Sequence, residues 1–183
     1  MSKNFVISVM SKDRPGIVAD VTSAIYELNG DLADLNQSVL CGYFTMILIA
    51  KFRSSVSESE IVEKLSAVNS ETKLEVVVKE AEKIEKVDRQ FDMNYILTAQ
   101  GENKSGLVAQ IGNFCKDFNI NILDLGTTLK DELYTMILLI DLKEIDSISE
   151  LSKELKKFGD KANLNLVLQH EDIFKATTDV NSL

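Results

Sequence analysis

Two short segments of the sequence carry side chains that could bind a small charged molecule. The first contains Asp13 and Arg14 ahead of Gly16. A glycine there lets the backbone approach a neighbour closely, and free N–H groups at the start of a helix can hold a carboxylate. The second contains Asn29 and Asp31, which offer an amide and a carboxylate. Together these groups complement the two ends of a small zwitterion, and the sequence therefore predicts a site of that kind.

The same side chains also have an explanation that needs no ligand. Asp13 can cap the first turn of a helix, and Pro15 suits its first position. Asn29 and Gly30 can end that helix, since glycine tolerates the left-handed conformation beyond a helix end. The spacing alone favours this structural explanation.

Residues for other kinds of chemistry are sparse. His170 is the only histidine, and the two cysteines, Cys41 and Cys115, lie far apart. The usual ligands of a structural zinc site cannot be assembled from this set, and a disulfide framework is not indicated. No glycine-rich phosphate loop, GxSxG elbow or HExxH motif is present. We therefore expect no metal, no cofactor and no catalytic residue, and a reducing, cytoplasmic location.

The charge of the chain excludes one large class of partner. Its 29 acidic and 20 basic side chains give a formal charge of −9. A protein this acidic lacks the positively charged surface that binding to a phosphate backbone needs, so direct nucleic-acid binding is not expected. The apolar runs, such as 46–50 and 136–140, are far too short to span a membrane.

The elements that must position these residues are encoded twice. Shifting the sequence by 90 residues places 5–80 on 95–170, and 16 of the 76 aligned positions are identical. Matching groups include Gly16 with Gly106, Asn29 with Asn119, and the run 45–48 with 135–138. A repeat of this length is too long for a solenoid unit, so we interpret it as two copies of one small domain.

Each copy has the element order β-α-β-β-α-β. Apolar residues recur at three- and four-residue steps in the first helix, from Ile17 to Leu28, which predicts an amphipathic helix. Ser57 with Glu60 predicts a capping box for the second helix, and Ser147 with Glu150 repeats it. The expected strands and helices are 5–10, 15–28, 31–40, 44–52, a helix from 57, and 74–78, then 95–99, 105–118, 120–129, 134–142, 148–158 and 164–169.

This order predicts the fold class α+β, with two ferredoxin-like domains. Each has an antiparallel four-stranded sheet with both helices on one face. We expect a first domain at 1–82, a connector at 83–92, and a second domain with a C-terminal tail at 93–183. The tail after Glu171 is expected to be frayed.

One strand of each copy is apolar on both faces. In 44–52, Phe44 and Met46 alternate with Ile47 and Ile49, and 134–142 has the same character. An exposed patch of this kind marks an association surface, so we expect the copies to associate and the chain to form a homodimer. The alternative is that these are simply well-buried central strands.

A family resemblance adds to this interpretation. The run 13–18, Asp-Arg-Pro-Gly-Ile-Val, followed by 29–32, Asn-Gly-Asp-Leu, resembles the signature of ACT domains, which are ligand-sensing modules of amino-acid enzymes and regulators. Two such modules in a chain of this length resemble the glycine cleavage system transcriptional repressor group. The resemblance implies an amino acid held at interfaces between modules. The implied ligand-binding residues are Asp13, Arg14, Pro15, Gly16, Ile17, Asn29, Asp31 and Leu32, and in copy two Gly106, Leu107, Asn119, Asn121 and Ile122.

The second copy departs from this signature. Residues 103–106 read Asn-Lys-Ser-Gly in place of Asp-Arg-Pro-Gly, and Ile120 stands where copy one has Gly30. We therefore expect the two copies to be unequal in binding.

These observations favour a non-catalytic regulatory protein. It would bind a small amino acid and modulate a partner, either a transcription factor or a metabolic enzyme. The alternative is a ligand-independent interaction module or regulatory subunit of an amino-acid metabolic enzyme. A small enzyme is the least favoured class, because no nucleophile–base pair occurs in both copies.

Overall fold

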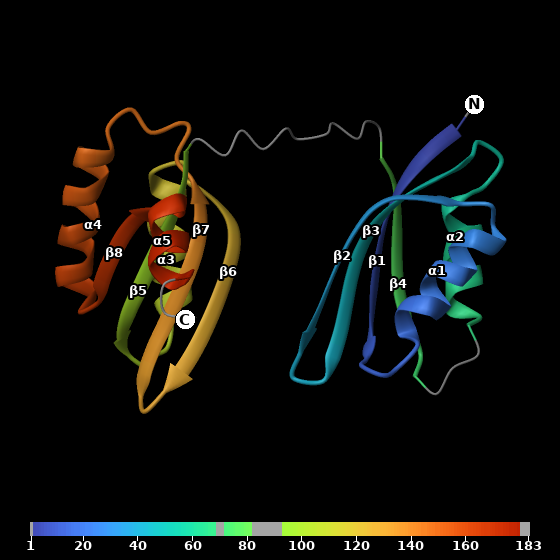
Figure 1. Cartoon of the computed structure of the whole chain (residues 1–183), viewed down its shortest axis with the longest axis horizontal. Coiled ribbons are helices and arrows are strands. Elements are labelled where there is room, and N and C mark those ends of the chain that lie inside the picture. The colour runs from blue at the N-terminus through green and yellow to red at the C-terminus, as the bar shows by residue number, and fades with distance from the viewer. Residues whose placement is uncertain (1, 69–71, 82–92, 180–183) are drawn as a thin grey trace. The chain divides into compact units, whose positions relative to one another are not determined.

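The chain folds into two compact units, Met1–Val87 and Asp88–Leu183. The computed structural model describes residues 2–68, 72–81 and 93–179 (Figure 1). The connector expected at 83–92 lies outside the described residues, so the expected boundaries stay a prediction. Among the described helices, none is long and apolar enough to cross a membrane.

Both units have the predicted β-α-β-β-α-β order and an antiparallel four-stranded sheet, which confirms the fold class. In the first unit the strand order is β2-β3-β1-β4, and in the second it is β6-β7-β5-β8. The elements of the first unit are β1 (Ser2–Lys12), α1 (Ile17–Glu27), β2 (Asp31–Leu40), β3 (Tyr43–Arg53), α2 (Glu58–Ser66) and β4 (Glu75–Ala81). Those of the second are β5 (Asn94–Glu102), α3 (Leu107–Asp117), β6 (Asn121–Lys130), β7 (Leu133–Asp141), α4 (Ile148–Ala162), β8 (Asn165–His170) and α5 (Glu171–Asp179).

The strand registers of the two units coincide after the 90-residue shift. Val9 pairs with Val76 in the first unit, and the equivalent Ala99 pairs with Leu166 in the second. Even the irregularity at the start of β2, between Leu32 and Asp34, recurs at the same place in β6. The repeat seen in the sequence is therefore a repeat of backbone pairing.

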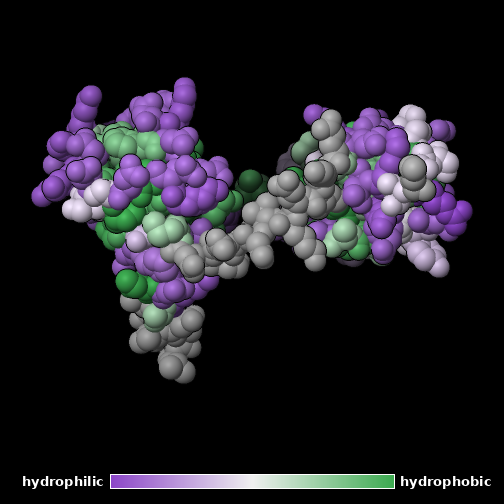
Figure 2. Space-filling view, turned by 90° about the horizontal axis from the view of Figure 1, so that it is seen from above, coloured by the Kyte–Doolittle hydropathy of each residue, from purple (hydrophilic) through white to green (hydrophobic). Residues whose placement is uncertain are grey.

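Each core lies between the sheet and its helices. In β3 the inward side chains of Phe44, Met46, Leu48 and Phe52 are at most 1% exposed. The opposite face of the same strand is open, and Ile47 on it is 57% exposed. Burial on both faces, the alternative for this strand, is therefore wrong within the unit. Figure 2 shows apolar surface, in green, interrupting the polar surface of the molecule.

The first turn of α1 differs from the expected arrangement. Its N-cap is Gly16, with φ of 85°, and no side chain caps the helix. Asp13 is not the cap, because Gly16 occupies that position; the backbone N–H of Asp13 donates to the Gly42 carbonyl at 2.9 Å. The left-handed Gly16 turns the chain, so the helix starts at Ile17 and Pro15 precedes it.

Gly30 is required for a reason other than the predicted one. Asn29 is the residue in the left-handed region, with φ of 55°. A Cβ on Gly30 would lie 2.4 Å from Cε1 of Phe52 and 2.7 Å from Cγ2 of Ile25. The glycine therefore makes room for the Phe52 ring. In the second unit the buried Ile120 and Leu142 occupy the equivalent positions, so a medium pair replaces a small and a large residue.

The segment after β8 was expected to be frayed, and that expectation is wrong for 171–179. These residues form α5, which contacts β5 and β8 (Figure 1). Asn94 Nδ2 donates to Glu171 Oε2 at 3.3 Å, and Ile96 beside it on the sheet is only 7% exposed. The helix therefore covers part of the sheet face that α3 and α4 leave open, and these tertiary contacts order it.

Candidate functional site

Arg14 is held tightly within the first unit. Its Nε donates to Thr72 Oγ1 at 3.0 Å and its Nη2 to Asp20 Oδ2 at 2.5 Å, and the side chain is only 14% exposed. Nη1 also donates to the Pro15 carbonyl at 3.2 Å. The guanidinium thus joins the first turn of α1 to the segment that leads into β4. To bind a ligand it would have to give up these partners.

The remaining predicted residues of the first unit fall into two groups at opposite ends of α1. Asp13 and Gly16 are exposed ahead of the helix, while Ile17 is buried in the core. Asn29 and Asp31 are exposed beyond its other end, and Leu32 beside them is exposed as well. Eleven helical residues rise roughly 16 Å. A small amino acid cannot reach both groups in one unit, so a site that uses both needs two modules.

The second unit repeats this backbone with different charges. Gly106 is again a left-handed N-cap with no capping side chain, and Leu107 after it is buried. Lys104, in place of Arg14, turns back to Glu102 at 3.0 Å. At the far end of α3, Asn119 has φ of 55° and is exposed. Asn121 and the half-buried Ile122 follow it at the start of β6.

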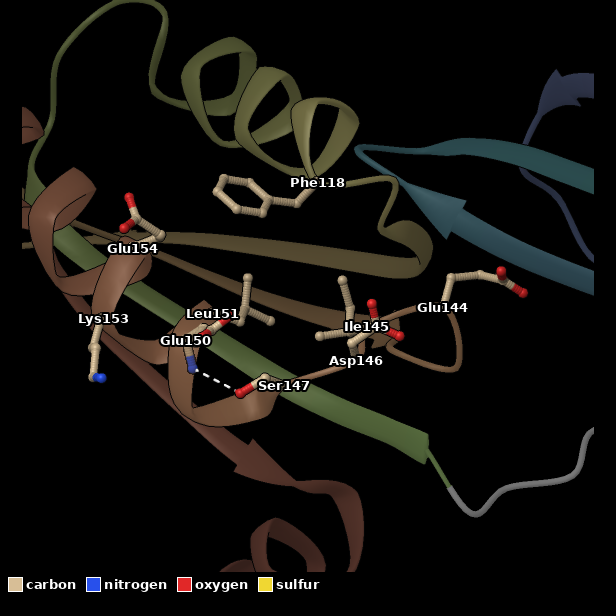
Figure 3. A pocket seen from close by; sticks show the side chains of 9 residues that line it. All are labelled: Phe118, Glu144, Ile145, Asp146, Ser147, Glu150, Leu151, Lys153 and Glu154. Atoms are coloured by element: carbon tan, nitrogen blue, oxygen red, sulfur yellow. Dashed lines mark hydrogen bonds between the residues drawn. The ribbon is translucent and has the colours of Figure 1, made fainter.

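Sequence reasoning missed an acidic pocket at the start of α4 (Figure 3). Phe118, Ile145 and Leu151 provide its apolar part. The N-terminus of α4 is capped by Ser147, whose Oγ accepts from Glu150 N–H at 3.3 Å. Glu150 lies in the first turn of this helix, where the helix dipole favours negative charge, and the pocket has three further carboxylates, Glu144, Asp146 and Glu154. The full lining is Phe118, Glu144, Ile145, Asp146, Ser147, Glu150, Leu151, Lys153 and Glu154.

A second missed feature, the α3–α4 cleft, is a cavity of about 350 Å³ between the two helices of the second unit. Its floor is aromatic, and its rim carries amides and one charge of each sign. Its lining residues are Gln110, Asn113, Phe114, Asp117, Phe158, Lys161 and Ala162. The sequence held a signal for it, since aligning the copies places Phe114 and Phe158 on Ala24 and Val68.

Two titratable groups outside these sites have pKa values shifted from their ordinary ones, Cys115 and Glu171. Burial raises the pKa of the Cys115 thiol, which keeps it protonated and unreactive. The pKa of Glu171 is lowered mainly by a hydrogen bond from Lys175. Both residues lie in α5, one turn apart, so the pair stabilises this helix internally. Within the described residues, no group of three or more His, Cys, Asp or Glu side chains could hold a metal ion.

Comparison with known proteins gives a consistent result for both units. A family model described as ACT domain matches residues 3–79 and again residues 94–169. A UPF0237 protein of Methanocaldococcus jannaschii is 37% identical over 81 residues, which is 44% of this chain and 90% of the relative. A UPF0237 protein of Clostridium perfringens is 36% identical over 88 residues, 46% of this chain and 96% of the relative.

Two solved structures have the same fold as this chain over most of its length. A protein of unknown function from Galdieria sulphuraria has a TM-score of 0.72 at 20% identity, over 92% of this chain and 98% of that one. A proposed glycine cleavage system transcriptional repressor has a TM-score of 0.72 at 15% identity, over 92% of this chain and 97% of that one. At these identities the likeness concerns the fold alone.

Proposed function

Because this chain belongs to the ACT domain family, with one copy in each half, we propose that it is a non-catalytic regulatory protein that senses a small amino acid. The observation that carries the proposal is the repeated entry into the first helix. In both units a left-handed glycine opens a helix that no side chain caps, leaving backbone donors for a carboxylate. The groups that would bind the rest of the ligand are Asn29 and Asp31 or their counterparts, supplied by another module.

A ligand shared between modules would act by shifting a population. The ligand favours the associated state, in which both parts of its site meet. It can shift the equilibrium only by the difference between its affinities for the associated and separate states. We propose that this change alters docking on a partner that governs amino-acid metabolism, a transcription factor or an enzyme, in the cytoplasm. The likeness to the proposed repressor supports the first kind of partner, and the charge of −9 argues that regulation does not involve direct contact with DNA.

Association of two chains is part of this proposal. β2 is an edge strand whose ten residues are all exposed, and an unpaired edge is a ready template for pairing. The open face carrying Ile47 and Tyr43 is a second candidate contact. Sedimentation should therefore report a dimer, and Ile47→Glu or a proline at Asn36 should show which of the two surfaces carries it. Monomers at high concentration would contradict this part.

The test of sensing is a thermal-shift titration of the full chain with glycine, serine, and the branched-chain and aromatic amino acids. Asn29→Gly removes the amide while permitting the left-handed conformation, so it should abolish the response without a large loss of stability. Arg14→Ala is less discriminating, since it also breaks the bonds to Asp20 and Thr72. Asn119→Gly is the matched control in the second unit, and it reports which copy responds.

The second candidate is a ligand-independent interaction module. It is favoured by the fact that Arg14 is satisfied inside its own unit. Under this alternative no amino acid shifts the melting temperature, while dimer formation and partner binding persist in the Asn29→Gly variant.

A further inference from the structure

We propose that the α3–α4 cleft of the second unit binds an amino acid with an apolar, preferably aromatic, side chain. The inference rests on the proposed function for the ligand class, but it assigns a site that shares no residue with the loop and strand positions considered above. The two units share a backbone fold but differ in the side chains that lie between their two helices.

Three aromatic rings separate the helices of the second unit. Phe114 stacks on Phe118 with ring centroids 4.6 Å apart, and it contacts Phe158 with centroids 5.0 Å apart. The aligned residues of the first unit are Ala24, Leu28 and Val68, which are smaller. Large side chains between two helices hold their axes farther apart, and the backbones of α1 and α2 indeed approach more closely than those of α3 and α4. The space so created is the cleft of about 350 Å³.

The corresponding place in the first unit is closed by Arg14. Its guanidinium binds Asp20 and Thr72, and these align with Gln110 and Ala162, which both line the cleft. In the second unit Lys104 pairs with Glu102 instead, and Ala162 offers no partner for a bridging side chain. The entrance between the helices therefore stays open.

The rim of the cleft matches a zwitterion. Asp117 on α3 can bind an ammonium group and Lys161 on α4 a carboxylate, and in the part of the chain that the structure describes neither has an ion-pair partner within 4.0 Å. Gln110 and Asn113 add amide donors and acceptors. The rings of Phe114 and Phe158 form an apolar floor on which a ligand ring can stack. The volume lies in the range of small-molecule sites, about 300–1,000 Å³.

The test is calorimetric titration of the full chain with L-phenylalanine, L-leucine and glycine. Phenylalanine should bind at least about tenfold more tightly than glycine, because glycine leaves the aromatic floor uncovered. Lys161→Glu should weaken phenylalanine binding by about tenfold or more, since it places a carboxylate against a carboxylate. Lys157→Glu is the matched control on the same helix, outside the cleft, and should change affinity by less than about twofold.

Phe158→Val copies the residue of the first unit and should also weaken binding. Should this variant unfold, the Lys161 and Lys157 pair still decides the question, since both substitutions are on the surface. Phenylalanine binding that survives Lys161→Glu but is lost in Asn29→Gly would overturn the cleft and leave the proposed function standing. Binding lost in Lys161→Glu and kept in Asn29→Gly would assign the site to the cleft. No binding of any amino acid would reject both.

Discussion

The contact between Gly30 and Phe52 yields a sharp test of the packing described above. In Gly30→Ala the new Cβ would lie 2.4 Å from Cε1 of Phe52 and 2.7 Å from Cγ2 of Ile25. Carbon atoms prefer about 3.5–4.0 Å. Both neighbours are 1% exposed and belong to the core, which close packing makes costly to rearrange. We expect a loss of about 1–3 kcal/mol in the free energy of unfolding, as for other overpacked cores.

The second unit suggests a second substitution that should restore the stability lost in Gly30→Ala. Ile120 and Leu142 fill the equivalent positions, so Phe52→Leu should relieve the clash that Gly30→Ala creates. Phe52→Leu alone leaves a void and should cost about 1 kcal/mol. The double variant should be more stable than the sum of the two single losses by about 1 kcal/mol or more.

The assay is urea unfolding followed by circular dichroism, with hydrogen exchange on β1 and β3 to assign the transition to the first unit. Gly112→Ala on α3 is the control, because its added Cβ meets no atom within 4 Å. That substitution should stabilise the chain by up to about 1 kcal/mol through helix propensity alone. A neutral or stabilising Gly30→Ala, or strictly additive losses in the double variant, would refute the reasoning.

Other expected outcomes concern the charged and capping groups. Ser147→Ala should lower the free energy of unfolding of the second unit by about 1 kcal/mol in urea, because it removes the N-cap acceptor for Glu150 N–H. Arg14→Ala should lower the free energy of unfolding by about 1–2 kcal/mol, whereas Lys104→Ala, which breaks an exposed ion pair, should change it by less than about 0.5 kcal/mol. Equal effects would contradict the conclusion that Arg14 closes the space between the helices of the first unit while Lys104 leaves it open in the second. The folded-state pKa of Glu171 lies below the ordinary 4.5, so the ionised carboxylate stabilises the fold above pH 4.5, and this stabilisation is lost as the pH falls through the lower folded value. Hydrogen exchange of α5 should rise in that pH range, and Glu171→Gln should remove the pH dependence. A thiol reagent should label the exposed Cys41 quickly and Cys115 only on unfolding, and equal rates would mean that the second core opens readily.

Much of the fold was predictable because apolar residues recur in the sequence at regular intervals. The 90-residue repeat and the alternation in strands such as 44–52 reflect side chains that must face one core, so pattern and pairing agree. The serine part of the capping boxes was predictable for a similar local reason. Ser57 Oγ accepts from Glu60 N–H at 3.2 Å, and this bond depends on only four consecutive residues.

The misses all involve contacts between segments distant in sequence. Asp13 looked like a cap, but Gly16 occupies that position, and the Asp13 N–H donates to the Gly42 carbonyl, 29 residues away. Gly30 looked like a helix stop, while its need is set by Phe52 from another strand. α5 has few residues and little propensity of its own, and the side chain of Asn94 helps to hold it. The roles of the predicted ligand-binding residues stay predictions, because no contact inside one unit joins their two groups.

The cover that α5 gives to the second sheet has a consequence for any product that lacks this helix. All four strands of the second sheet precede this helix in the sequence, so the sheet can form without it and leave the face around Ile96 bare. A message truncated after His170 would yield a product that keeps this bare patch permanently. Such a product should stick to its neighbours and be cleared by proteases, although every strand of its sheet is present.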